Sequence, residues 1–152
     1  ALAAREPIGR IAELLIAAQL AGLAQEASAL GVLHARSREQ FGRPIGAFQA
    51  VAHHCANMEL RARAARAQVL EAAAACQSGR GDAGFQVAAA ALLCGEAALS
   101  NAALAIRVHG AMGFTADAPL HHMLKRAHLL LGFSASRAAH RTTLLAEPVE
   151  PG

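Results

Sequence analysis

The stretch REQFGRPIGAFQ, residues 38–49, is a compact break between two long alanine-rich segments. Gly42, Pro44 and Gly46 interrupt helical backbone here, because proline lacks a backbone donor and glycine lowers helix propensity. The segments on either side carry apolar residues at steps of three and four, which is the period of an amphipathic helix. The stretch therefore predicts a tight connection between two long helices.

Five helical segments are expected along the chain, and no strand is expected. They run over about residues 7–36, 47–76, 85–109 and 120–131, and a fifth segment, capped by Ser134 or Ser136, runs to Ala146. Long helices with short connections favour neighbours that run in opposite directions. The sequence therefore predicts an all-α fold, an antiparallel up-down helical bundle of four main helices plus a short C-terminal helix.

Two of these segments carry apolar stripes that predict which face is buried. The stripe on the first segment comprises Ile11, Leu14, Leu15, Ala18, Gly22, Gln25 and Ala29. The stripe on the second segment comprises Met58, Ala62, Ala65, Val69 and Ala72. Gly22 lowers helix propensity, so we expect it to mark the close approach of a neighbouring helix.

The composition fits one helical domain and argues against nucleic acid as a partner. The 152 residues, 55% of them hydrophobic, are enough for one core. The net charge is +3, but the arginines are spread along the predicted helices and the chain has no Trp and no Tyr. We expect one bundle over residues 1–147 and a tail over 148–152. Because the chain begins with alanine rather than methionine, we also expect it to be a piece of a longer protein.

The cysteines and histidines show no pattern typical of a metal site or a redox site. Cys55, Cys76 and Cys94 are widely spaced with no CxxC, so we expect buried free thiols in a reducing, cytoplasmic compartment. No Cys/His cluster has zinc spacing, and no metal is expected. The longest apolar run, around Val87–Gly95, is about half the length that a bilayer needs, so no membrane span is expected.

A second motif, RVHGAMGF at residues 107–114, follows the third predicted helix. The two motifs in this order resemble the C-terminal helical domain of the acyl-CoA dehydrogenases, which are FAD enzymes that oxidise the Cα–Cβ bond of acyl-CoA thioesters. The resemblance covers about residues 9–146. It implies an N-terminal helical domain and a middle β-domain outside this sequence, an acyl-CoA substrate, and a homo- or hetero-oligomer (dimer or tetramer). It also implies that an electron-transferring flavoprotein can accept the electrons.

The resemblance assigns the first motif to FAD binding. Arg38 matches a family arginine that contacts the FAD pyrophosphate of a neighbouring subunit, and a guanidinium suits phosphate oxygens. Phe41 and Gly42 match as well, and Phe48 and Gln49 match a pair near the flavin. The alternative is that Arg38 only closes the turn by bonding carbonyls at the helix end.

The second motif matches the family less completely. Gly110 is retained, but Arg107 stands for a family glutamine and Ala111 for a glycine. In the family this loop passes the adenosine side of FAD, where glycine lets the backbone approach the ligand. Arg107 either takes a pyrophosphate oxygen or is a solvated arginine at the helix end.

The catalytic position departs furthest from the family. The residues FSAS at 133–136 fall on the family's Tyr-Glu-Gly-Thr, whose glutamate is the base that removes the α-proton. Ser134 replaces that glutamate, and a hydroxyl cannot serve as the base near neutral pH. Ser136 keeps a hydroxyl where the family threonine touches the flavin region.

Some family members place the base on the first helix instead. The ungapped alignment puts that position at Ala12, one residue before Glu13, and one residue turns a helix by about 100°. Glu13 is therefore either an alternative base or an ordinary exposed glutamate. Two functions remain open, a domain of an acyl-CoA dehydrogenase and a non-catalytic subunit of a heteromeric one. A plain helical bundle with chance motifs is the third interpretation.

Overall fold

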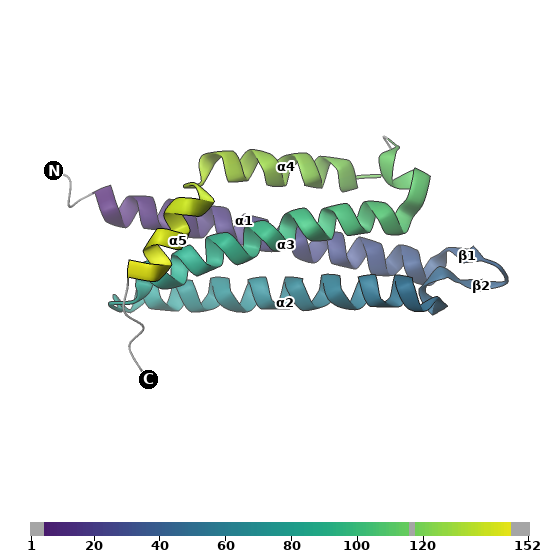
Figure 1. Cartoon of the computed structure of the whole chain (residues 1–152), viewed down its shortest axis with the longest axis horizontal. Helices are drawn as coiled ribbons and strands as arrows, with labels where there is room; N and C mark the ends of the chain where they lie inside the picture. Colours follow the sequence, from purple (N-terminus) through teal and green to yellow (C-terminus); the bar gives the residue numbers. More distant parts are fainter. Residues whose placement is uncertain (1–4, 116–117, 147–152) are drawn as a thin grey trace.

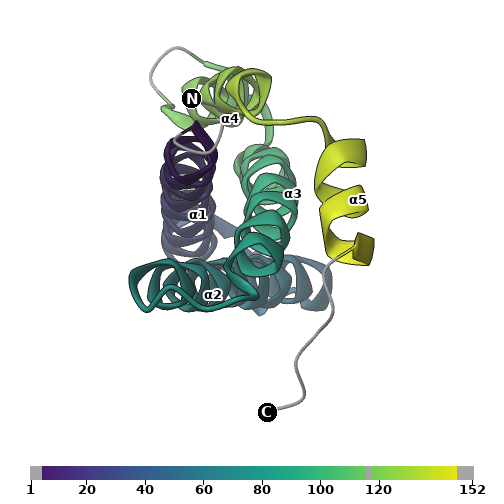
Figure 2. The ribbon, with the colours of Figure 1, turned by 90° about the vertical axis from the view of Figure 1, so that its left-hand side faces the viewer.

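The computed structural model of this chain describes residues 5–115 and 118–146. Three long helices, α1 (Arg5–Ser37), α2 (Gln49–Gln77) and α3 (Ala83–His109), are followed by α4 (Leu120–Phe133) and the short α5 (Arg137–Ala146). Helices α1 and α3 lie side by side at the centre, with α2 on one side of the pair and α4 on the other (Figures 1 and 2). Helix α5 packs beside α3. The predicted antiparallel bundle is confirmed, and the predicted tail at 148–152 lies outside the described residues.

The connection between α1 and α2 contains a small hairpin, so the prediction that the chain has no strand was wrong. Strand β1 (Glu39–Gln40) pairs antiparallel with β2 (Arg43–Pro44), and a 3₁₀ turn, η1 (Ile45–Ala47), follows. The two residues between the strands have positive φ, 55° at Phe41 and 76° at Gly42. This pair of left-handed residues is typical of a tight type I′ hairpin turn. Strands of two residues leave no alternating pattern, which is why the sequence did not reveal them.

Small side chains form most of the core, which lets the helices approach closely. The fully buried residues are mainly alanines, among them Ala17, Ala24, Ala65, Ala72, Ala90, Ala98 and Ala105. A Cβ added at Gly31 would lie 2.7 Å from Cε of Met58, and one added at Gly95 would lie 2.9 Å from Cδ2 of Leu131. Close helix approach therefore occurs at these two glycines. It does not occur at Gly22, which is exposed with nothing within 4 Å of an added Cβ, so that prediction was wrong.

The buried face of α2 was predicted correctly, whereas that of α1 was not. Met58, Ala62, Ala65 and Ala72 are buried, and Val69 packs against the core cluster that contains Ala65 and Ala72. On α1 most of the predicted stripe is exposed. The buried face comprises Ala17, Leu20, Ala21, Ala24, Ala27, Ser28, Gly31 and Ala35. Apolar residues occur all round α1, as exposed Ile11 and Leu15 show, so their period did not single out one face.

Asn101 joins the three long helices from inside the core. Its side chain is fully buried, and Nδ2 donates to the backbone carbonyls of Ala24 on α1 (3.0 Å) and Met58 on α2 (2.8 Å). Two carbonyl acceptors require the amide nitrogen at this place, which fixes the orientation of the amide group. A side chain of α3 therefore bonds both neighbouring helices at one level of the bundle.

The three cysteines are free, but only Cys94 is fully buried, and Cys55 and Cys76 are half-buried. Burial raises the pKa of the Cys94 thiol to about 12, which keeps it protonated and unreactive.

By length and hydropathy alone, the segments Ile8–Ser37 and Ala83–Phe114 could cross a bilayer. Because they provide the core of this bundle, and core helices pass the same test, the absence of a membrane span stays a prediction.

Candidate functional site

The residues that the sequence singled out fall into two groups at opposite ends of α1 (Figure 1). Glu13 lies in the first half of α1, and Arg38 follows its last residue, Ser37. Helical rise over the residues between them corresponds to about 37 Å. The group near Glu13 also contains Ser134 and Ser136. The group near Arg38 comprises Phe41, Phe48, Gln49, Arg107, Gly110 and Ala111.

Glu13 and Ser134 are in direct contact. Ser134 is the residue after α4, and its Oγ donates to Oε2 of Glu13 at 2.6 Å. The backbone N–H of Ala135 donates to the other carboxylate oxygen, Oε1, at 2.7 Å. The side chain of Glu13 is 19% exposed. Ser134, which replaces the family's usual glutamate, and Glu13, the candidate alternative base, thus form one site, with a carboxylate held by two donors.

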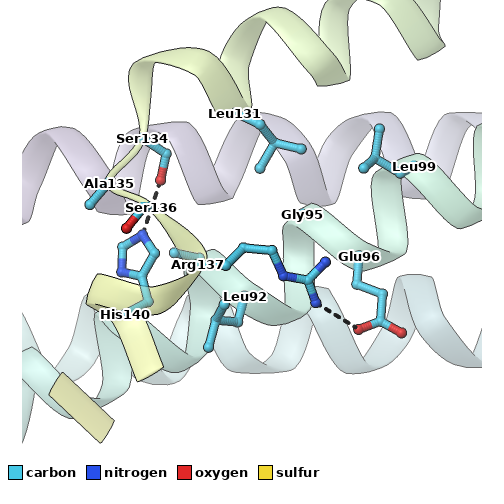
Figure 3. Close-up of a pocket in the computed structure, with 11 residues that line it drawn as sticks. Leu92, Gly95, Glu96, Leu99, Leu131, Ser134, Ala135, Ser136, Arg137 and His140 are labelled. Atoms are coloured by element: carbon cyan, nitrogen blue, oxygen red, sulfur yellow. Dashed lines mark hydrogen bonds and ion pairs between the residues drawn. The ribbon is translucent and has the colours of Figure 1, made fainter. Parts of the chain in front are cut away.

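His140 is the third member of this site, and the sequence did not indicate it. It lies on α5 and is 7% exposed. Its Nε2 is 3.1 Å from Oγ of Ser134 and 3.5 Å from Oε2 of Glu13 (Figure 3 shows the contact with Ser134). The hydroxyl of Ser136 caps α5 by accepting the N–H of Ala139 at 3.1 Å, as one of the two predicted caps. This cap begins α5 one turn before His140, and it is the one local signal that could have located the imidazole.

The arrangement differs from a Ser–His–Asp triad. In a triad the histidine stands between the carboxylate and the hydroxyl and uses both ring nitrogens. Here Ser134 stands between Glu13 and His140, and both contacts of the imidazole are made through Nε2. This arrangement does not activate the serine as a nucleophile. The carboxylate of Glu13, in contrast, is held in a fixed position that suits proton transfer.

A small pocket of about 160 Å³ adjoins Ser134 and His140 (Figure 3). Its apolar walls come mainly from α3, which contributes Ala91, Leu92, Gly95 and Leu99, and Leu131 of α4 adds to them. Glu96 and Arg137, 3.9 Å apart and both well exposed, also line it. The site is thus apolar on one side and polar where the serine and the histidine meet.

The opposite end of α1 presents exposed aromatic and cationic groups. Phe41, at the tip of the hairpin, is 92% exposed, and its ring meets that of Phe48 edge-on at 6.1 Å. The guanidinium of Arg43 lies 4.2 Å from the centroid of Phe48. Gln49 is the first residue of α2.

The backbone of Arg38 closes the turn, because its carbonyl accepts the N–H of Ile45 at 2.8 Å and its N–H bonds the carbonyl of His34 at 2.9 Å. No hydrogen bond joins its guanidinium to any residue in the described part of the chain.

A stacked pair of histidines joins the last turn of α1 to the end of α3, where the second motif lies. The rings of His34 and His109 are 4.0 Å apart at 19°. Burial lowers the pKa of His34, and neighbouring His109 and Arg38 lower it further. Gly110 follows His109 with a φ of 62°, while a Cβ at Gly113 would lie 2.6 Å from the carbonyl oxygen of Ile106. The backbone conformation at Gly110 and the close contact at Gly113 therefore explain why glycine occupies both positions. Arg107 and Ala111 are exposed beside it.

Within residues 5–115 and 118–146, no group of three His, Cys, Asp or Glu side chains could hold a metal ion. The candidate site has two parts. Glu13, Ser134 and His140 form an acid–base cluster near one end of α1, and exposed cationic and aromatic groups lie at the other end.

The chain resembles known proteins over nearly its whole length. The family model described as acyl-CoA dehydrogenase, C-terminal domain, matches residues 10–144. FadE34 of Mycobacterium tuberculosis, an acyl-CoA dehydrogenase, is 39% identical over 145 residues, which are 93% of this chain and 20% of FadE34. IpdE2 of the same organism, also an acyl-CoA dehydrogenase, is 39% identical over 121 residues, 80% of this chain and 36% of IpdE2. The chain thus spans a fifth to just over a third of the length of these relatives.

A solved structure shows the same fold. The ChsE4–ChsE5 complex from Mycobacterium tuberculosis superimposes with a TM-score of 0.84 at 28% identity, over 93% of this chain and 39% of the matching chain.

Proposed function

This chain belongs to the acyl-CoA dehydrogenase family as a C-terminal helical domain, and we propose that it serves the α,β-dehydrogenation of an acyl-CoA thioester within a longer, FAD-dependent, cytoplasmic protein. The observation that carries the proposal is the contact between Glu13 and Ser134 at 2.6 Å. A carboxylate from α1 reaches the position where the chain has lost the family's glutamate. We therefore assign the removal of the α-proton to Glu13.

The environment of Glu13 supports this role. Two donors, the Ser134 hydroxyl and the Ala135 N–H, fix the direction of the carboxylate, and the side chain keeps 19% of its surface exposed. A base needs such a fixed position together with access to the substrate. Glu13 meets both conditions, although the alignment places the family's alternative base one residue earlier.

The hairpin end of α1 fits FAD. The Arg38 guanidinium is exposed and hydrogen-bonded to none of the described residues, so it is available for bidentate contact with a phosphate. Phe41, Phe48 and Gln49 would hold the ligand beside it, together with Arg107, Gly110 and Ala111 of the second motif. Ser136, which lies near Glu13 at the other end of α1, would contact a second FAD. FAD, when bound, supplies the acceptor for the hydride that leaves the β-carbon, and an electron-transferring flavoprotein is the expected partner that takes the electrons onward.

The test compares the full-length protein that contains this chain with its Glu13→Gln variant. We expect similar FAD content and a turnover of acyl-CoA that is lower by about 100-fold or more, since a general base contributes on that scale. Glu26→Gln is the matched control, because Glu26 is an exposed glutamate on the same helix. Turnover that survives in Glu13→Gln would show that Glu13 is not the base.

The serine at position 134, in place of the usual glutamate, favours a second possible function. A chain without the usual glutamate could be the non-catalytic subunit of a heteromeric acyl-CoA dehydrogenase, lending Arg38 to the FAD of its neighbour. The similarity to a chain of the ChsE4–ChsE5 complex supports a partner of this kind. The expected result is then no turnover by the protein alone, and FAD binding only after co-expression with a homologous subunit. FAD binding by the protein alone, with turnover, would rule this alternative out.

A further inference from the structure

We propose that Ser134 and His140 form a proton relay with Glu13. The proton taken up by Glu13 is passed through the Ser134 hydroxyl to Nε2 of His140. This inference rests on the proposed function, because it assumes that Glu13 receives the α-proton. Neither the family motifs nor the alignment assigned any role to His140. Its role comes from the contacts that α5 makes with the end of α4 and with α1.

The distances define one path for the proton. Oε2 of Glu13 and Oγ of Ser134 are 2.6 Å apart, and Oγ of Ser134 and Nε2 of His140 are 3.1 Å apart. Both separations are within the range of hydrogen bonds, whereas the direct separation of 3.5 Å between Oε2 and Nε2 lies at its limit. The hydroxyl of Ser134 is therefore the bridge between the carboxylate and the imidazole.

The tautomer of His140 decides whether this path can accept a proton. An ionised carboxylate only accepts, so the hydrogen of Ser134 goes to Glu13. A neutral imidazole with its proton on Nδ1 accepts at Nε2, whereas the tautomer with its proton on Nε2 donates to Oγ and already fills the contact. The relay therefore requires the tautomer with its proton on Nδ1.

The transfer is balanced and breaks no bond between heavy atoms. The proton from the α-carbon binds the carboxylate of Glu13. The protonated carboxyl then donates through Oε2 to Oγ of Ser134, while the proton already on Oγ moves to Nε2 of His140. The products are an ionised Glu13, an intact serine hydroxyl and an imidazolium. The carboxylate and the imidazolium remain next to each other and stabilise each other's charge.

Few other charges face His140. Glu13 approaches from α1, and Glu96 approaches from α3, where it is paired with Arg137 of α5 at 3.9 Å. The side chains of Glu96 and Arg137 are 67% and 63% exposed, so water screens their influence. Helix α4 contributes the apolar Leu131 to the same pocket. Glu13 is therefore the charge that dominates the surroundings of the imidazole.

The first test is the pH dependence of kcat in the full-length, FAD-loaded protein. The relay needs an unprotonated Nε2, so we expect the pH profile of kcat in the wild type to have an acidic limb that depends on the imidazole. His140→Gln keeps an amide donor for Ser134 but cannot take up a proton, so it should abolish this acidic limb and lower kcat by about tenfold, with KM unchanged. Ser134→Ala, which cuts the path, should do the same.

Arg141→Gln is the control, because it removes the neighbouring charge on α5 and should keep the acidic limb. A limb that persists in His140→Gln would overturn the relay, and so would full turnover in Ser134→Ala.

A second measurement does not depend on turnover. ¹⁵N-histidine labelling of the same protein, with the His140→Gln spectrum to identify the signal, shows which ring nitrogen carries the proton. We expect an unprotonated Nε2 near neutral pH, and a protonated Nε2 there would overturn the proposal. The Glu13→Gln variant distinguishes a failure of the proposed function from a failure of the relay. If it keeps its turnover, the proposed function fails. If it is inactive while His140→Gln keeps the acidic limb, only the relay fails.

Discussion

At the scale of single residues, the stacked pair of His34 and His109 makes stability depend on pH. Burial, His109 and Arg38 lower the pKa of His34 below its ordinary value of 6.5. As the pH falls through 6.5, the unfolded chain therefore binds a proton before the folded chain does, and the folded state loses stability. The contribution of His34 is complete above pH 6.5 and is lost progressively below it.

We expect His34→Gln to reduce this loss of stability on acidification. Urea unfolding at about pH 8 and about pH 5.5 measures it, because the window between them spans the titration of an imidazole. His53→Gln is the control, since His53 is exposed on α2 and does not belong to the stacked pair of His34 and His109. An equal loss of stability in His34→Gln and the wild type would contradict the expectation.

The same scale shows how far sequence could predict the acid–base site. Glu13 and Ser134 were each found by comparing single positions with a family pattern. Their contact joins residues 121 positions apart and depends on how α4 returns to α1, which no local pattern encodes. His140 lies in a short helix without any catalytic motif. Its role became visible only when the packing of α5 placed Nε2 beside Ser134.

At the scale of helices and loops, two glycines should respond in opposite ways to substitution by alanine. Gly22→Ala should raise the free energy of unfolding by up to about 1 kcal/mol, because alanine favours helix and nothing lies within 4 Å of the new Cβ. Gly113→Ala should lower it by about 1–3 kcal/mol, because its Cβ would lie 2.6 Å from a backbone oxygen of Ile106. Thermal unfolding of the two variants checks both signs, and a stabilised Gly113→Ala would refute the packing argument.

The helices themselves were predictable and their contacts were not. Breaks at Gly42, Pro44 and Gly110 placed the helix ends within a few residues of those observed. The buried face of α2 followed from its stripe, whereas that of α1 did not, because α1 has apolar residues on both its buried and its exposed sides. The hairpin escaped prediction because its turn depends on φ values at Phe41 and Gly42 rather than on a repeating pattern.

At the scale of the whole molecule, Asn101 should couple the stability of the three long helices. Asn101→Ala removes the two hydrogen bonds that join α3 to Ala24 of α1 and Met58 of α2 in the core. We expect a loss of about 2–4 kcal/mol in the free energy of unfolding, measured by urea denaturation. Asn57→Ala, at an exposed position on α2, should change it by no more than about 0.5 kcal/mol. Equal effects of the two variants would show that Asn101 does not join the helices energetically.

Under the proposed function, the length of α1 determines how many chains contribute to each FAD site. Glu13 on α1 and Arg38, directly after its last residue, lie about 37 Å apart, which is longer than a single dinucleotide. Under the proposed function, each chain therefore supplies its carboxylate to one flavin and its guanidinium to another, and complete sites are made two at a time by two chains. A pair in which only one chain carries a working base would contain one productive flavin, so turnover per bound FAD would be half that of a homodimer.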